Sequence, residues 1–420
     1  MNYNVKLVFL FSFFQSFGRG IWMGNVLSAY IFFISDKSNR LLGWTSAVTG
    51  ITLTIFVFPS GYFADKIGRD VLLKIAGVIG TIGLFFILFG KTLVFVFIAL
   101  ALWGLFQGLT RPSLESIFAD SVESGRRSRI YSWLHLTRQL AMSIGPFVNV
   151  GLFAFFGDEW EIDILRSVMI VGIIITFISV VIMLFFNDKR SLGERSESIE
   201  EEITQINNSK ENGFGSKLTK DQAKKLIPIL LVGSNVIIGI GAGMTIKYFP
   251  IFFLDVYLLK PIWVQVIMGL TTIFTGLAAL LAQRISIEKG RPLIIFSAQL
   301  LATLCLFGIA SYPIFNITLP ILIPLFIARG SLMNAAQPLS RSILMDVIPK
   351  KHRGKWNSLE AFAWGFFWNF SAVVGGYLIG DVAPYKFWLC FIVTASVYIV
   401  GIIPILFLIP LVGKEKSVKT

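Results

Sequence analysis

Ionisable side chains lie inside long apolar runs of this 420-residue sequence, where they are costly and usually face a protein interior or a water-filled cavity. The basic members are Arg19, Arg111, Arg138, Arg166, Lys247, Arg329 and Arg341, and the acidic members are Glu115, Asp255 and Glu360. Four bases lie deepest in their runs: Arg19, Arg138, Lys247 and Arg329. Because no acid lies at comparable depth, a bound anion would balance their charge. The sequence therefore predicts a site for an anionic or polar solute.

The alternative for any one of these bases is a structural role, such as a bond to a helix-end carbonyl or to Glu115. Uncharged polar and aromatic side chains accompany the deep bases at helical spacing, and we include them in the predicted substrate site. These residues are Gln15, Tyr248, Asn334, Gln337 and Trp364. Glycines 239, 241 and 243 precede Lys247 and favour a bend in that segment.

Two groups are candidates for carrying a proton. Glu115 stands four residues after Arg111, so that the two side chains share one helix face and can neutralise each other. His135 is the second candidate, because an imidazole titrates near neutral pH. Neither His135 nor His352 has the neighbours that a zinc site needs, so no metal site is predicted.

The elements that must position these residues are apolar helices. Hydrophobic residues make up 55% of the chain and charged residues 15%, with 40 phenylalanines, which is typical of a protein dissolved in lipid. Runs of about 20 apolar residues, without the alternation of barrel strands, predict an all-α, polytopic membrane protein. Twelve spans are expected at residues 8–34, 41–64, 71–90, 93–118, 130–156, 164–186, 226–254, 262–282, 293–312, 317–342, 359–380 and 387–411.

The net charge of +13 has an explanation other than nucleic-acid binding. If both termini are cytosolic, most of the 37 Lys and Arg residues fall on the cytosolic side of the predicted spans, as the positive-inside rule requires. No basic arm interleaved with aromatic residues is present. We therefore expect a multi-pass membrane protein with cytosolic termini and no nucleic-acid partner.

The twelve predicted spans divide into two halves. Residues 1–187 are expected to form one six-helix bundle, residues 188–225 a charged cytosolic linker, and residues 226–420 a second bundle with a short tail. Pro112, Asp120 and Arg127 occur in the last part of the fourth span and after it, and Pro338, Asp346 and Arg353 occur at the tenth with the same spacing. Such internal repeats are typical of transporters whose two halves are pseudosymmetric.

The predicted turn after the second span reads GYFADKIGRD from Gly61 to Asp70. It resembles the signature G-x-x-x-D-[RK]-x-G-R-[RK] of the major facilitator superfamily, except that Asp70 replaces the usual final base. A weaker copy, which ends in Gly290 and Arg291, follows the eighth span. The resemblance covers the whole chain and implies the major facilitator fold of two pseudosymmetric six-helix bundles.

The resemblance also implies a gating network on the cytosolic face. Its residues would be Gly61, Asp65, Gly68, Arg69, Asp120 and Arg127 in the first half, with Asp346 and Arg353 in the second. From the residues themselves, Gly61 permits close helix contact, Gly68 permits a tight turn, and Asp65 can cap a helix or pair with a base. A role in turn formation and topology alone is the alternative.

These observations predict a secondary transporter that moves a small solute by alternating access, with an organic anion as the favoured class of solute. The alternatives are a proton-coupled exporter of amphipathic drugs and, from another class, a non-transporting membrane receptor or scaffold on the same fold. The chain has no G-x-x-x-x-G-K-[ST] phosphate loop and no catalytic constellation, so neither an enzyme nor a cofactor is expected. The expected partners are the solute and the lipid bilayer, and the protein is expected to be monomeric.

Overall fold

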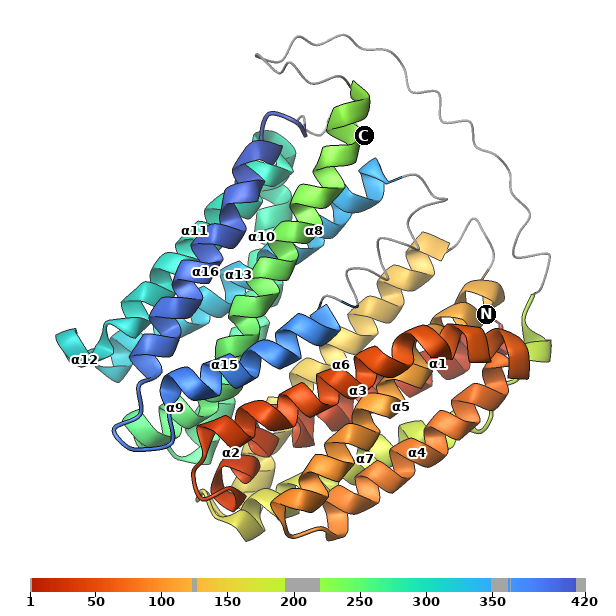
Figure 1. The fold of residues 1–420 in the computed structure, drawn as a ribbon, viewed down its shortest axis with the longest axis horizontal. Helices are drawn as coiled ribbons and strands as arrows, with labels where there is room; N and C mark the ends of the chain where they lie inside the picture. Colours follow the sequence, from red (N-terminus) through yellow and green to blue (C-terminus); the bar gives the residue numbers. More distant parts are fainter. Residues whose placement is uncertain (1, 123–126, 193–219, 349–361, 363, 413–420) are drawn as a thin grey trace. The chain divides into compact units, whose positions relative to one another are not determined.

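The computed structural model describes residues 2–122, 127–192, 220–348, 362 and 364–412, and every regular element among them is a helix (Figure 1). Helices satisfy their own backbone hydrogen bonds, which is a requirement wherever lipid surrounds the chain. Ten of the described helices are long and apolar enough to cross a membrane. The chain is therefore an all-α, multi-pass membrane protein.

Packing divides the chain into two compact units. Unit 1 contains residues 1–202, 247–269 and 372–381, and unit 2 contains the remainder. These units are defined by packing and do not test the predicted division into two bundles and a linker, which stays a prediction.

Unit 1 is built mainly from the first half of the sequence, where α1 packs against α6 and α7, and α5 packs against α3 and α4. Its complete helices are α1 (Tyr3–Trp22), α2 (Asn25–Ile34), α3 (Asn39–Ile67), α4 (Arg69–Phe89), α5 (Leu93–Ser121), α6 (Arg127–Phe156), α7 (Ile162–Met183), η2 (Asp188–Arg190) and α9 (Phe249–Val256). It also includes the first part of α10 (Pro261–Lys289) and the later part of α15 (Asn369–Ile379).

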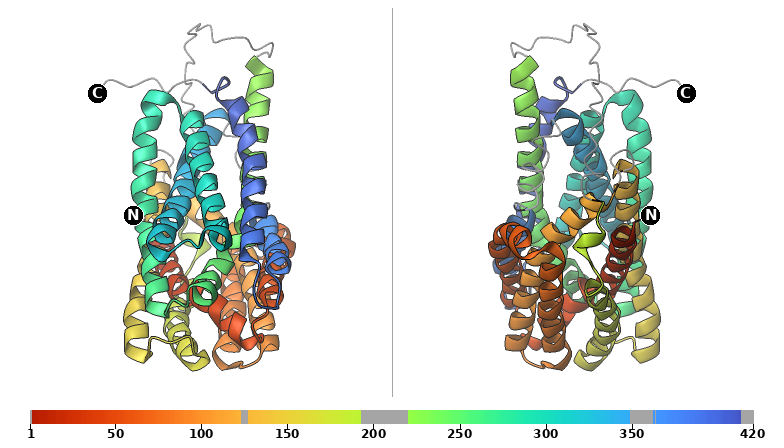
Figure 2. Two further views of the ribbon diagram at one scale, coloured as in Figure 1. Left: turned by 90° about the vertical axis from the view of Figure 1, so that its left-hand side faces the viewer. Right: turned by 90° about the vertical axis from the view of Figure 1, so that its right-hand side faces the viewer.

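Unit 2 contains the other helices of the second half, which run side by side in Figure 2, coloured green to blue. There α11 packs against α13 and α16, and α16 packs against α8. The helices are α8 (Lys220–Thr245), α11 (Arg291–Ala310), α12 (Tyr312–Phe315), α13 (Leu319–Val347), the π-helical turn η5 (Trp364–Trp368) and α16 (Phe387–Leu408). The short 3₁₀ turn η4 (Ile246–Tyr248) links α8 to α9.

Polar contacts within unit 1 join segments that are far apart in the sequence. The side chain of Asn39, at the start of α3, donates to the carbonyl of Gly380 at 2.8 Å, and Ser38 donates to Asp381 at 3.0 Å. The carboxylate of Asp381 also lies 3.4 Å from Nε of Arg40. The end of the α15 segment is thereby fixed to the start of α3.

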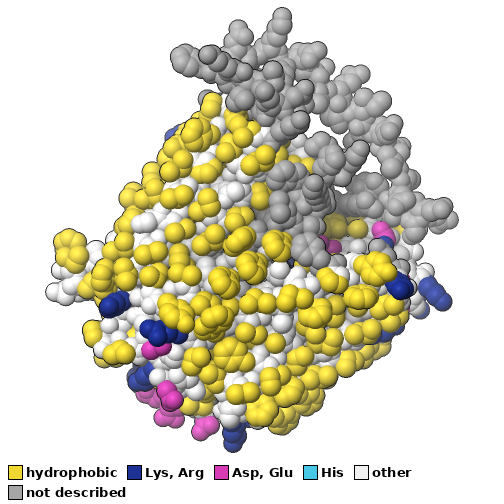
Figure 3. Space-filling view, in the orientation of Figure 1, with side chains coloured by type: hydrophobic (Ala, Val, Ile, Leu, Met, Phe, Trp, Pro, Cys, Tyr) yellow, Lys and Arg dark blue, Asp and Glu magenta, His cyan; other side chains and the backbone are white. Residues whose placement is uncertain are grey.

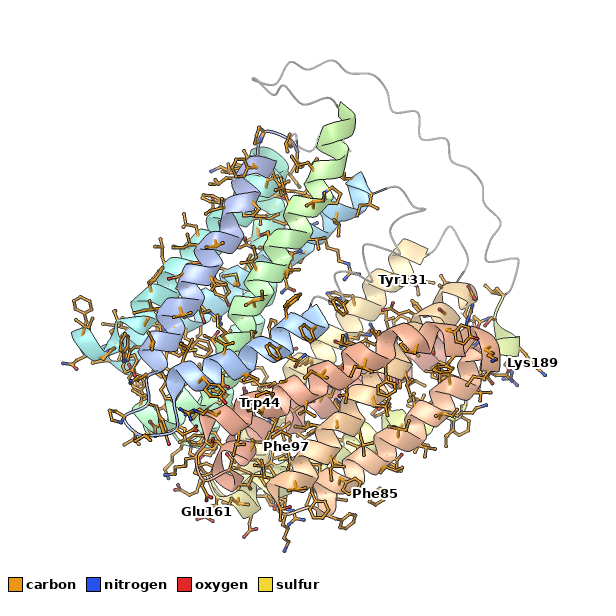
Figure 4. The ribbon with its side chains drawn as sticks, viewed as in Figure 1. Trp44, Phe85, Phe97, Tyr131, Glu161 and Lys189 are labelled. Carbon is orange, nitrogen blue, oxygen red and sulfur yellow. The ribbon has the colours of Figure 1, made fainter. Side chains whose placement is uncertain are left out.

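A second set of contacts fixes the start of α10 to the loop before α7. Lys260 donates to Glu159 at 2.7 Å, and this bond raises the pKa of the Lys260 ammonium above its usual value. Asp158 accepts from the backbone N–H of Ile262 at 2.9 Å, which satisfies a helix N-terminal donor. The carboxylates of Asp158 and Glu159 belong to one acidic loop. The same loop contains Glu161, which is labelled in Figure 4.

The predicted spans agree with the observed helices except at three places. The first is divided into α1 and α2, because Met23 is extended and Gly24 has a φ of +82°, which a continuing helix cannot adopt. The seventh predicted span contains three helical pieces, α8, η4 and α9. The eleventh is observed as η5 and α15, after residues that lie outside the described chain.

Side chains on the helix surfaces match a lipid environment. Hydrophobic groups cover most of the described helices on the face in Figure 3, and charged groups gather towards the helix ends. Phe85 of α4, which is 50% exposed, points away from the neighbouring helices in Figure 4. Exposed apolar side chains of this kind are expected where acyl chains are the solvent.

Candidate functional site

Arg19 and Arg138 belong to two helices of unit 1 that approach very closely. Gly20 of α1 and Gly145 of α6 lie back to back, since a Cβ added to Gly145 would overlap the backbone of Gly20. This approach allows Nε of Arg138 to donate to Oγ of Ser12 on α1 at 3.1 Å. Gly145 therefore has a packing role that brings a basic side chain of α6 to Ser12 of α1.

Arg111 of α5 adds a third base to this part of unit 1. Its Nη2 atom donates to Oε1 of Gln107 at 3.1 Å, one helical turn away. The charge of Arg111 is close enough to act on Arg19, and Glu115 acts on both Arg111 and Arg138. Among the described residues Glu115 forms no ion pair, so the predicted Arg111–Glu115 pairing gives way to a bond between Arg111 and a neutral amide.

The other predicted polar residues of unit 1 lie on the same helices. Nε of Arg19 is 3.4 Å from Sδ of Met23, and Gln15 is half-buried one turn before Arg19. His135 is exposed on α6, one turn before Arg138. The structure thus brings Arg19, Arg138 and Glu115 into electrostatic range of Arg111 or of one another.

Lys247 and Tyr248 occupy η4, and their surroundings differ. Lys247 is half-buried, whereas Tyr248 is fully buried, with its hydroxyl 2.6 Å from the carbonyl oxygen of Ala372 and 3.2 Å from that of Asn39. The Tyr248 hydroxyl fits there because a Cβ on Gly43 or Gly376 would approach it to 2.8 Å. In this arrangement Tyr248 packs between α3 and α15 and offers no surface to a solute.

Arg329 lies in the interior of unit 2, on α13, and only 5% of its surface is exposed. Its Nη2 atom donates to the Tyr398 hydroxyl at 3.0 Å and is 3.5 Å from Oγ1 of Thr245. The ring of Tyr398 reaches this position because Gly241 of α8 has no side chain, and a Cβ there would come within 2.8 Å of the ring. Gly241 therefore serves close helix packing, and α8 continues through the three glycines to Thr245.

A single pocket of unit 2 contains three of the predicted substrate residues: Arg329, Asn334 and Gln337. Nε2 of Gln337 donates to Oδ1 of Asn334 at 3.2 Å, and both side chains are exposed within α13. The pocket is also lined by Asn235, Ile238, Ala242, Ile246, Gln299, Met333, Ser340, Trp368 and Tyr398.

Four polar lining residues escaped the sequence analysis: Asn235 of α8, Gln299 of α11, Ser340 of α13 and Tyr398 of α16. A search restricted to ionisable residues and their near neighbours could not find them. Gln299 carried a usable signal, because it is a lone carboxamide within an otherwise apolar run.

Two of the predicted gating residues of unit 1, Arg69 and Asp120, meet near the turn between α3 and α4. Gly68 has a φ of +94°, which confirms the expected tight turn. Arg69, the first residue of α4, forms an ion pair with Asp120 near the end of α5. Asp120 lies inside α5 rather than after it, because the helix continues beyond residue 118 to Ser121.

The remaining gating residues are less informative. A Cβ on Gly61 would meet no described heavy atom within 4 Å, so no close helix contact depends on this glycine here. Arg353 lies outside the described residues. The backbones of four other predicted site residues are described, but their side chains are not: Asp65, Arg127, Asp346 and Trp364.

The turn between α10 and α11 repeats the backbone of the first-half turn. Gly290 has φ +93° and ψ +138°, and Gly68 has φ +94° and ψ +139°. The arginine that follows Gly290, Arg291, donates to the hydroxyl of Ser342 on α13. The second half therefore keeps both the turn and an arginine that bonds to a later helix.

The sequence and the structure of this chain are similar to those of several known proteins. A curated Na(+), Li(+), K(+)/H(+) antiporter of Planococcus maritimus is 25% identical over 183 residues, which is 42% of this chain and 42% of that protein. A solved D-xylose–proton symporter has a TM-score of 0.70 at 15% identity, covering 98% of each chain. The nucleoside transporter NupG has a TM-score of 0.67 at 14% identity, covering 96% of this chain and 98% of its own.

The structural likenesses establish the fold, and the family follows from the sequence. The model of the Major Facilitator Superfamily matches residues 8–328 and 264–420. With its helices, its signature turn and its repeat of that turn, the chain belongs to the Major Facilitator Superfamily.

Proposed function

We propose that the protein carries a small organic anion across its membrane by alternating access, working as a monomer. The observation that supports this most directly is the group of three arginines on neighbouring helices of unit 1, Arg19 of α1, Arg111 of α5 and Arg138 of α6, with Glu115 of α5 as the acid that accompanies them. Charge at membrane depth is costly unless it is balanced. An anionic cargo supplies that balance while it is bound.

Gating in this proposal depends on the Arg69–Asp120 pair. The pair joins the start of α4 to the end of α5, and its side chains remain partly exposed, at 26% and 36%. A partly exposed pair is weak enough to be broken and remade during a transport cycle. Asp65 and Arg127 would complete this network in the first half, and Asp346 and Arg353 would act in the second.

The test is flux in proteoliposomes that contain the purified protein and labelled organic anions such as lactate, gluconate or citrate. We expect saturable exchange that does not require a pH gradient. Arg138→Gln and Arg19→Gln should each raise KM about tenfold or more, because each removes a charge-assisted hydrogen bond to the anion.

The matched control is Arg284→Gln on α10, which removes an equally basic but exposed side chain with no bond to another described residue. Its KM should stay within about twofold of the unmodified protein, as surface substitutions have small effects. Saturable flux of no organic anion, or equal loss in Arg284→Gln and Arg138→Gln, would contradict the proposal.

A second candidate is proton-coupled exchange of a cation, and the similarity to the Planococcus antiporter over 183 residues favours it. Glu115 or His135 would then carry the proton. Efflux of Na⁺, K⁺ or a lipophilic cation driven by an imposed pH gradient, and abolished by Glu115→Gln, would support this candidate and overturn the first. A surplus of arginines around Glu115 argues against it, since like charge repels a cationic cargo.

A further inference from the structure

The pocket around Arg329 lies wholly within unit 2, between α8, α11, α13, η5 and α16. Its space is about 30 Å³, enough for one or two water molecules or for a carboxylate group. Polar residues from four different helices converge on a volume of this size. Such convergence is unusual in a membrane interior, where an unsatisfied polar group is expensive.

Two of the lining side chains are buried without a partner in the described part of the chain. Gln299 is 4% exposed and its Oε1 atom has no hydrogen bond, and Ser340 is 3% exposed and its Oγ atom has none. Both side chains line the pocket. Each therefore has bonding capacity that an occupant of the pocket can use.

The charge of the pocket lining determines which sign of charge the occupant should carry. Arg329 is the one charged side chain among its described lining residues, and no Asp or Glu accompanies it there. A carboxylate is the natural partner of a guanidinium. A zwitterion such as an amino acid is disfavoured, because its ammonium group would lie near Arg329 without an acid to receive it.

The hydrogen-bonding groups of the pocket indicate that the occupant also carries a hydrogen-bond donor. Tyr398 is fully buried and its hydroxyl already accepts from Arg329, so that its own proton remains available for an acceptor. The unpaired Oε1 of Gln299 needs a donor. A carboxylate satisfies Tyr398, but only an O–H or N–H of the ligand satisfies Gln299.

We propose that this pocket binds a hydroxylated carboxylate, with Arg329 and Tyr398 on the carboxylate and Gln299 and Ser340 on the adjacent hydroxyl. The inference rests on the proposed transport of organic anions and narrows it to one chemical class. Asn334 and Gln337, at the exposed side of α13, extend the site towards longer hydroxylated chains.

The experiment compares pairs of acids that differ by one hydroxyl, lactate against propanoate and glycolate against acetate, by calorimetric titration of the purified full chain. We expect the hydroxylated member to bind at least about tenfold more tightly, because the analogue leaves buried polar groups unpaired. Gln299→Leu should reduce the ratio of the lactate affinity to the propanoate affinity to near one. The propanoate affinity itself should stay within about twofold of that of the unmodified protein. Arg329→Gln should weaken both acids about tenfold.

Ser340→Ala provides an independent test if Gln299→Leu does not fold, and its matched control is Ser297→Ala on α11, an exposed serine bonded only to its own helix at 2.9 Å. The Ser340 variant should lower the ratio and the Ser297 variant should not. If anions bind but the preference for the hydroxylated acid is unchanged in Ser340→Ala and in any folded Gln299 variant, this inference is wrong while the proposed function still stands. Failure of any organic anion to bind or to be transported would overturn the proposed function as well.

Discussion

At the residue scale, Tyr248 illustrates how a polar group is satisfied where water is absent. Its hydroxyl reaches the carbonyls of Ala372 and Asn39, and Gly43 and Gly376 leave the space it needs. The residue was predicted from sequence to contact a solute because it adjoins Lys247. Its burial instead assigns it a packing role in this arrangement, which a neighbouring charge in the sequence cannot indicate.

Tyr248→Phe should lower the free energy of unfolding by about 1 kcal/mol, because the hydroxyl loses its bond in a buried position while the ring is kept. Thermal unfolding in detergent measures the change. Tyr62→Phe is the control, since Tyr62 is 65% exposed, and it should have almost no effect. Equal changes in the two variants would show that the buried bond contributes nothing.

At the element scale, the crossing of α1 and α6 determines where the arginines of unit 1 can meet. Gly20 and Gly145 allow the two backbones to touch, and the Arg138–Ser12 bond follows from that closeness. Close approach through small residues is a common way for helices to associate in membranes.

Gly145→Ala should destabilise the protein by about 1–3 kcal/mol, since its methyl group would overlap the backbone of Gly20. Gly151→Ala lies on the same helix, where a Cβ meets no described atom within 4 Å. That variant should be neutral or slightly stabilising, because alanine favours helix. Thermal unfolding of both variants measures the two changes in stability. The prediction is wrong if Gly145→Ala destabilises the protein less than Gly151→Ala does.

The Arg69–Asp120 pair leads to a prediction at the same scale. Asp120→Asn should lower the transport rate several-fold while it changes the free energy of unfolding by less than about 1 kcal/mol, as expected for a partly exposed pair. Asp70→Asn is the control, because Asp70 pairs with Lys74 inside one helix at 3.3 Å and fixes no second helix. A loss of stability without a loss of rate would make Asp120 structural rather than gating.

At the scale of the whole molecule, the apolar runs were sufficient to predict an all-α membrane protein, and the resemblance of the Gly61–Asp70 turn supplied the family fold. The interruptions were not predictable, because a glycine in an apolar run does not reveal that Gly24 will adopt a positive φ. Part of the unit 2 pocket was predicted, since Arg329, Asn334 and Gln337 share one helix at helical spacing. Gln299 and Tyr398 were not, because only the packing of α11 and α16 against α13 and α8 brings them to it.

Membrane orientation is a further prediction for the molecule as a whole. We propose that η2 faces the cytosol and that the acidic loop before α7 faces outward, because basic residues are retained on the cytosolic side. In a background without Cys305 and Cys390, a membrane-impermeant maleimide added to intact cells should label Glu161→Cys and leave Lys189→Cys unlabelled until the cells are opened. The reverse pattern would invert the assigned orientation.

Unit 1 incorporates residues 247–269 and 372–381, which the ribosome makes long after α7. Until those residues emerge, Asn39 lacks its Gly380 acceptor and the acidic loop lacks Lys260. Domains usually fold in order as they are synthesised. The packing of unit 1 is therefore completed only after residues 372–381 have been synthesised, although α1 to α7 are made first.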